Sequence, residues 1–149
     1  MPSRRPFLQQ AALVGAGALS SPALAAPAAT PAVRSTRSDV KITGIRCHVV
    51  HKLALVELTT DAGVTGWGEC AWDGEGLMPR FVEDLLKKHC VGQSVHDVRR
   101  LWDWMFYENH DLGPGGALPN AIAGIDIALW DVKGRLLGLP IHQLLGGAY

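Results

Sequence analysis

The sequence predicts an α+β domain in which a three-stranded antiparallel β-meander is followed by a helical bundle. Two observations lead to this prediction. Apolar and polar residues alternate over short runs before Trp72, whereas apolar residues after it recur at intervals of three and four. Short connections separate the early runs, so neighbouring strands are expected to pair as hairpins.

Three early runs have the alternation of half-buried strands. In the first run, Ile45, Cys47 and Val49 share one face. Arg46 and His48 share the opposite face, which we expect to be exposed. The three strands are expected at residues 40–50, 53–60 and 64–70.

The third strand carries two glycines, Gly66 and Gly68, in its interior. Because glycine has no side chain, these positions allow another backbone or an aromatic ring to come close. We therefore expect a neighbouring element to pack tightly on this strand.

Helical spacing follows Trp72, and it is interrupted twice by glycine and proline. Ser94 followed by Asp97 resembles a capping box, which would begin the second helix. The longest helix is expected to begin at Pro119 or Asn120. The helices are expected at residues 77–92, from the cap at 94 to 106, at 121–137 and, as one last turn, at 141–145.

The longest helix is apolar on most sides, yet it contains Asp126. A carboxylate among Ile122, Ile125 and Leu129 needs a polar partner, since an unpaired buried charge costs stability. Two roles stay open, a structural hydrogen bond within the domain and a contact at an interface. Asp126 and Asp131 point about 140° apart on a helix, so they do not form an acid–base pair.

Composition excludes several function classes. Among 149 residues, Lys plus Arg and Asp plus Glu each number 14, so there is no basic footprint for nucleic acid. The three cysteines are widely spaced, which fits neither a disulfide framework nor a zinc site; we expect small buried side chains with at most one bridge. No nucleophile–base pair, metal cluster or phosphate loop is present in the pattern.

The N-terminus is predicted to be an export signal at residues 1–25, followed by a disordered spacer at 26–38. Ser3-Arg4-Arg5-Pro6-Phe7-Leu8 resembles the twin-arginine motif, which would send a folded protein to the periplasm. An ordinary Sec signal with two arginines is the alternative. No later apolar run is long enough to cross a membrane, so the folded domain is expected at 39–149 without a membrane contact.

Three segments resemble the N-terminal capping domain of the mandelate racemase/muconate lactonizing branch of the enolase superfamily. They are TTDAGVTGWGE (Thr59–Glu69), NAIAGIDIALWDVKGRLLGLP (Asn120–Pro140) and IHQLLGG (Ile141–Gly147). They occur in the family's order and span nearly all of the chain after Val40. The short connection at residues 51–52 and the Gly-Pro-Gly-Gly loop are most similar to sugar-acid dehydratases such as galactonate or mannonate dehydratase.

The resemblance implies an enzyme that depends on Mg²⁺. Such enzymes abstract the α-proton of a carboxylate substrate, stabilise an enediolate and, in dehydratases, lose water. The magnesium ligands and the base lie on a TIM-like barrel, so no catalytic or metal-binding residue is assigned to this chain. The partners implied are a sugar acid, the barrel domain and, as a further candidate, a second copy of the chain.

The resemblance also implies that cap loops close over the substrate and exclude water. The matching segments are residues 48–52, 72–75 and 107–116. Within them, the side chains suited to a sugar acid are those of His51, Lys52, Trp72, Asn109 and His110.

We expect the barrel to be encoded beyond Tyr149, and this chain alone to be inactive. Ile122, Ile125, Leu129 and Trp130 are then expected to contact the barrel in part, because a helix this apolar needs more cover than a small cap provides. The alternative is a stand-alone exported binding module or a non-functional remnant of such an enzyme.

Overall fold

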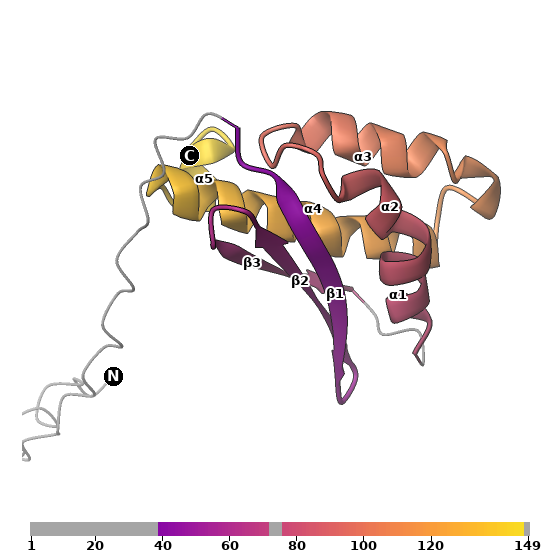
Figure 1. Cartoon of the computed structure of the whole chain (residues 1–149). Helices are drawn as coiled ribbons and strands as arrows, with labels where there is room; N and C mark the ends of the chain where they lie inside the picture. Colours follow the sequence, from indigo (N-terminus) through magenta and orange to yellow (C-terminus); the bar gives the residue numbers. More distant parts are fainter. Residues whose placement is uncertain (1–38, 72–75, 148–149) are drawn as a thin grey trace, which may run out of the picture. The chain divides into compact units, whose positions relative to one another are not determined.

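A computed structural model describes residues 39–71 and 76–147 as one α+β domain, in which helices cover one face of a small sheet (Figure 1). The predicted signal peptide, the predicted spacer and Trp72 lie outside the described residues. Within the described ranges, no helix combines the length and the apolar character that a membrane crossing requires.

The sheet is the predicted antiparallel meander. It consists of β1 (Ile42–Val50), β2 (Leu53–Thr60) and β3 (Thr65–Cys70), in the order β1-β2-β3. The first two strands are joined by a turn of only two residues, in which His51 has a φ of 59°. The left-handed conformation of this histidine allows the tight turn that a two-residue hairpin needs.

The alternation of β1 is confirmed for most of its length. Ile45 is fully buried and Cys47 is half-buried, whereas Arg46 is exposed. Val49 differs from the expectation, because 44% of its surface is exposed. The β1–β2 hairpin extends beyond the helices that cover the sheet (Figure 1), so the described helices leave Val49 near its tip partly uncovered.

The helices follow the predicted order with small changes at their ends. α3 starts at Val98, later than a cap at Ser94 predicts, so the predicted capping box is wrong. The Asp97 carboxylate accepts a 2.6 Å hydrogen bond from Arg100, so it is not used as a cap. The elements are α1 (Leu77–Pro79), a π-helical segment η2 (Arg80–Leu86), α2 (Lys87–Cys90), α3 (Val98–Tyr107) and a 3₁₀ turn η3 (His110–Leu112).

The longest helix, α4 (Ala117–Leu137), begins two residues before Pro119. Proline is tolerated there because N–H groups of the first helical turn have no partner within the helix. Gly138, with a φ of 66°, ends α4 as the left-handed residue of a helix C-terminus. The short helix α5 (Ile141–Leu144) follows.

Contact between α4 and β3 depends on the absence of side chains at three glycines. A Cβ atom on Gly68 would lie 2.7 Å from the backbone nitrogen of Ala128, and one on Gly124 would lie 2.6 Å from the sulfur of Cys70. Gly66 faces the same helix at similarly short range. The predicted close approach to the third strand is therefore confirmed, and the approaching element is α4.

The free edge of β3 is also tied to α4 by a hydrogen bond. The backbone N–H of Trp67 donates to the Asp131 carboxylate at 2.9 Å. Arg135, one turn later, donates to the same carboxylate at 3.0 Å. Asp131 thus binds an edge that would otherwise leave its N–H groups unpaired.

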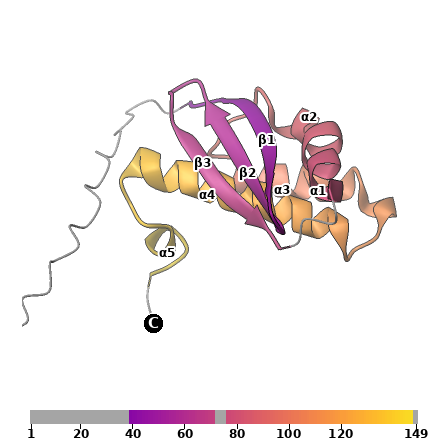
Figure 2. The same ribbon diagram turned by 90° about the horizontal axis from the view of Figure 1, so that it is seen from below.

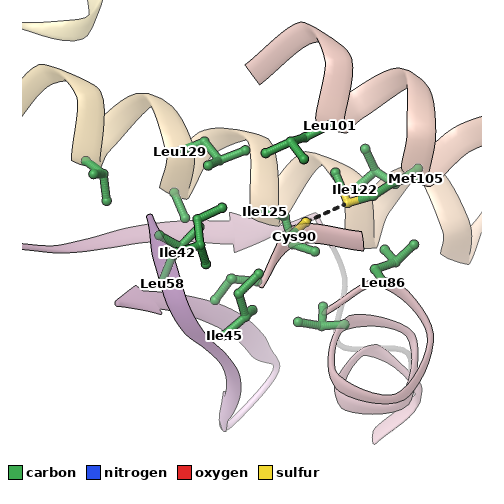
Figure 3. Packing of buried hydrophobic residues seen from close by; sticks show 14 of the residues in the cluster. Ile42, Ile45, Leu58, Leu86, Cys90, Leu101, Met105, Ile122, Ile125 and Leu129 are labelled. Carbon is green, nitrogen blue, oxygen red and sulfur yellow. Dashed lines mark hydrogen bonds between the residues drawn. The ribbon is translucent and has the colours of Figure 1, made fainter. Parts of the chain in front are cut away.

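The core lies between the sheet, α3 and α4 (Figure 3). Ile122, Ile125 and Leu129 have no exposed surface, because the inner face of the sheet and the helices of the same domain cover them. The expectation that these three residues contact a barrel is therefore wrong. Trp130 is half-buried and stays available for such a contact.

All three cysteines are free, so the one bridge that the sequence allowed is not formed. Cys47 lies on β1 and Cys70 on β3, with β2 between them. Strands two apart are separated by about 10 Å, whereas a disulfide needs Cα atoms closer than about 7 Å. Cys90 is buried elsewhere in the core, 3.6 Å from the sulfur of Met105.

Candidate functional site

Two of the predicted loop segments lie at one end of the domain. Ala54 pairs with Cys70, so β3 ends beside the turn between β1 and β2. Gly124 of α4 packs on Cys70. The helix begins at Ala117, seven residues before Gly124, so its N-terminus lies about 10 Å beyond this contact. The connection from α3 to α4 therefore lies on the same side as the hairpin turn, away from α5 (Figure 2).

The hairpin turn presents His51 and Lys52 to solvent. Both side chains are exposed, and no hydrogen bond or ion pair is found for either among the described residues. The neighbouring apolar residues Val50 and Leu53 are also exposed, at 56% and 47%. The tip thus combines an ammonium group and an imidazole with apolar surface, a combination suited to a carboxylate ligand with a carbon chain.

His110 offers one ring nitrogen to the outside. Its Nδ1 lies 2.6 Å from the carbonyl oxygen of Tyr107, so Nδ1 carries the proton that it donates. In the neutral ring, Nε2 is then an acceptor, and the side chain is exposed. This arrangement suits an incoming hydroxyl group.

Asn109 is placed differently from the other predicted residues. Only 6% of its surface is exposed, and its Nδ2 donates to the Met105 carbonyl at 2.8 Å. The same nitrogen lies 3.5 Å from Nε2 of His89. Asn109 therefore uses its amide nitrogen within the domain.

Within residues 39–71 and 76–147, no three His, Cys, Asp or Glu side chains come together as a metal site. His48, for example, pairs with Glu57 at 2.8 Å, while His51 lies in the turn. Described residues of this chain therefore do not form a magnesium site of the kind that three carboxylates provide.

A groove of about 320 Å³ runs between α3 and α4, and Asp126 lies in it. Trp130 also lines the groove and interacts with the Asp126 carboxyl group. Burial raises the pKa of Asp126, and the interaction with Trp130 offsets only part of this effect. The groove is lined by Val98, Arg99, Trp102, Asp126 and Trp130.

Exposed residues continue from this groove along α4. Ile127 and Leu137 are exposed at 44% and 45%, and Trp130 lies between them on the helix. Apolar side chains left open beside a half-buried carboxyl group are typical of an interaction surface. We call this surface, formed by Trp102, Asp126, Ile127, Trp130 and Leu137, the α4 docking face.

Sequence reasoning did not find His89 or Trp102 as parts of these sites. His89 and Asn109 are twenty residues apart, and no periodicity links a helix end with a loop. The helical spacing of Trp102 by itself predicts a core residue, although this side chain also lines the groove.

Comparison with known protein families gives one match over most of the chain. Residues 29–146 match the model of the mandelate racemase/muconate lactonizing enzyme N-terminal domain.

Relatives of known activity cover only this part of their own length. The D-galactonate dehydratase of Ralstonia pickettii is 41% identical over 92 residues, which are 62% of this chain and 24% of the relative. A D-mannonate dehydratase of Caulobacter vibrioides is 36% identical over 94 residues, 62% of this chain and 23% of the relative. The aligned region thus spans about a quarter of these enzymes.

A solved structure agrees with the same fold. The mandelate racemase/muconate lactonizing protein of Paracoccus denitrificans, complexed with magnesium, is 38% identical with a TM-score of 0.66. The match covers 74% of this chain and 31% of that one.

Proposed function

The chain belongs to the mandelate racemase/muconate lactonizing enzyme family through its N-terminal domain, and we propose that this domain caps the active site of a sugar-acid dehydratase. Two relatives named for D-galactonate and D-mannonate support a sugar acid as the substrate. The observation that carries the proposal is the placement of the exposed hairpin turn and the α3–α4 connection at one end of the domain.

In this proposal the chemistry is divided between two domains. Magnesium, held by the barrel, would stabilise the negative charge that develops when the α-proton is removed. The relative complexed with magnesium supports this assignment, and the described residues of the cap form no such site. The residues of this chain bind and orient the substrate and exclude water from it.

Lys52 is the cap residue suited to the substrate's charge. Its ammonium group is exposed at the turn, where a carboxylate approaching from solvent can reach it. His51 beside it and Nε2 of His110 supply partners for hydroxyl groups. We assign these three residues to the sugar acid, while Asn109 supports the α3–α4 connection from within.

The α4 docking face is the surface that we assign to the barrel domain. The relatives are about four times as long as the aligned region, so a large domain accompanies this cap in them. Asp126 lies half-buried between two tryptophans, and its unused lone pairs suit an N–H or guanidinium donor from that domain. Such a partner would compensate the desolvation that raises the pKa of Asp126.

Hydroxyl-radical footprinting tests the docking face. Residues 39–147 would replace the cap of the Ralstonia pickettii dehydratase, and side-chain oxidation would be compared with that of the chain alone. Trp102 and Trp130 should become protected in the chimera, whereas Trp67, which is 43% exposed on the open face of the sheet, should stay reactive. Unchanged oxidation of both groove tryptophans in a folded chimera would refute this assignment.

The same chimera tests the hairpin turn. Lys52→Met removes the charge at the turn, and we expect KM for D-galactonate to rise about fivefold, as for an exposed ion pair worth about 1 kcal/mol. Lys41→Met makes the same change next to the other end of β1 and should leave KM unaltered. Equal effects of the two substitutions would show that Lys52 does not contact the substrate.

A further inference from the structure

His89 and Asn109 form a buried polar contact behind the α3–α4 connection. His89 is the third residue of α2, and only 7% of its surface is exposed. Asn109, exposed by 6%, follows the end of α3. The two side chains meet at 3.5 Å between Nε2 of the histidine and Nδ2 of the asparagine.

The geometry fixes which partner donates in this contact. Nδ2 of Asn109 also donates to the Met105 carbonyl at 2.8 Å, so the amide cannot be reversed without placing two oxygens together. The second hydrogen of the same NH₂ group is directed at His89. Nε2 of His89 must therefore accept, which requires the neutral ring with its proton on Nδ1.

Asn109 determines where the connection leaves α3. Its backbone N–H donates to the Phe106 carbonyl at 3.2 Å, and its own carbonyl accepts from Leu112 at 3.0 Å. These bonds join the end of α3 to η3, and η3 leads toward the start of α4. A displacement of the Asn109 side chain would thus be transmitted to His110 and the residues after it.

We propose that His89 is a pH-sensitive latch, which holds the α3–α4 connection at neutral pH and releases it when the imidazole is protonated. Protonated His89 would present an N–H group to the N–H group of Asn109, and the contact would become repulsive. The release is a property of the described domain, whereas its consequence for a sugar acid rests on the proposed function.

The surroundings of His89 favour its neutral form. Burial lowers the pKa of His89, Lys88 on α2 lowers it further, and Glu108 at the end of α3 opposes them. Trp104, whose ring centroid lies 5.4 Å from that of His89, carries no charge. Because the pKa is lower in the closed state, stability of the closed connection is lost as pH falls below about 6.5.

Hydrogen exchange of residues 108–113 in the full chain, corrected for intrinsic rates, measures the release. The protection factor should fall between pH 7.5 and pH 5. The fall should be about tenfold for each pH unit by which the pKa of His89 is lower in the closed connection than in the open one. His89→Gln keeps an acceptor for Asn109 but cannot be protonated in this range, so its protection should not change with pH. His110→Gln removes the other histidine of the region and should behave like the wild type.

Histidine NMR of the unsubstituted chain keeps the test independent of the variants. We expect Nε2 of His89 to be unprotonated at pH 7.5 and its titration midpoint to lie below 6.5. A proton on Nε2 at pH 7.5, constant protection in the wild type, or undiminished pH dependence in a folded His89→Gln variant would each overturn the proposal. An inactive chimera would count against the capping function and would leave these results unchanged.

Discussion

Replacing Gly68 with alanine should push α4 away from β3. The added Cβ would lie 2.7 Å from the Ala128 nitrogen and closer still to the Gly124 carbonyl, and both are backbone atoms that no rotamer change can move. Overpacking costs typically about 1–3 kcal/mol, and a clash with backbone atoms places this substitution at about 2–3 kcal/mol. For a domain of about 100 residues, this corresponds to a Tm lower by about 10–20 °C.

Thermal unfolding followed by far-UV circular dichroism measures this effect. Gly115→Ala is the matched control, because a Cβ there meets nothing within 4 Å and the residue does not have a positive φ. Its Tm should change by no more than a few degrees. A Gly68→Ala variant as stable as this control would show that α4 does not approach β3 as closely as the structure places it.

Three further predictions concern side-chain chemistry and export. Cys70 is buried and its pKa is raised to about 12, so it should not react with DTNB at pH 8 in the folded chain. Half-buried Cys47 should react slowly. Rapid labelling of Cys70 would contradict its burial. The pKa of Asp126 is raised in the folded chain, so ionisation of this carboxyl group lowers the stability of the fold as pH rises above about 3.8. Asp126→Asn should therefore raise the Tm at pH 7 but not at pH 3. Equal shifts of the Tm at both pH values would argue against this cause. We propose that Arg4 and Arg5 direct twin-arginine export, so that replacing both with lysine blocks export of a fused reporter; normal export would favour the Sec route.

The sheet could be predicted from the sequence because its strands are short, alternating and joined by tight turns. Each of these signals is local, so pairing and order follow from the chain itself. The exposed Val49 could not be predicted, since alternation assigns a face to a residue but does not tell how far the covering layer extends.

Helix positions were predictable, but interactions at their ends were less so. Ser94 and Asp97 have the spacing of a capping box, yet Arg100 competes for the Asp97 carboxylate at 2.6 Å. α4 starts earlier than the predicted Pro119 or Asn120, because proline is tolerated throughout the first helical turn and therefore does not mark the first residue.

The candidate site was only partly predictable. The family resemblance implies His51 and Lys52 as loop residues of the site, and the structure describes both as exposed. The burial of Ile122 depends on elements that are distant in sequence, so an apolar helix face alone could not distinguish a core contact from a docking contact. The contact of Asn109 with His89 has the same non-local origin.

Sugar-acid turnover by the chain alone and by the chimera tests the capping account most directly. Loss of water from D-galactonate would be followed in the presence of Mg²⁺ for the purified chain and for the chimera that joins residues 39–147 to the remainder of the Ralstonia pickettii dehydratase. We predict turnover by the chimera and none above background by the chain alone, since the described residues supply no metal site and the proposal places the base on the barrel. Turnover by the chain alone, or a folded chimera without activity, would contradict the account.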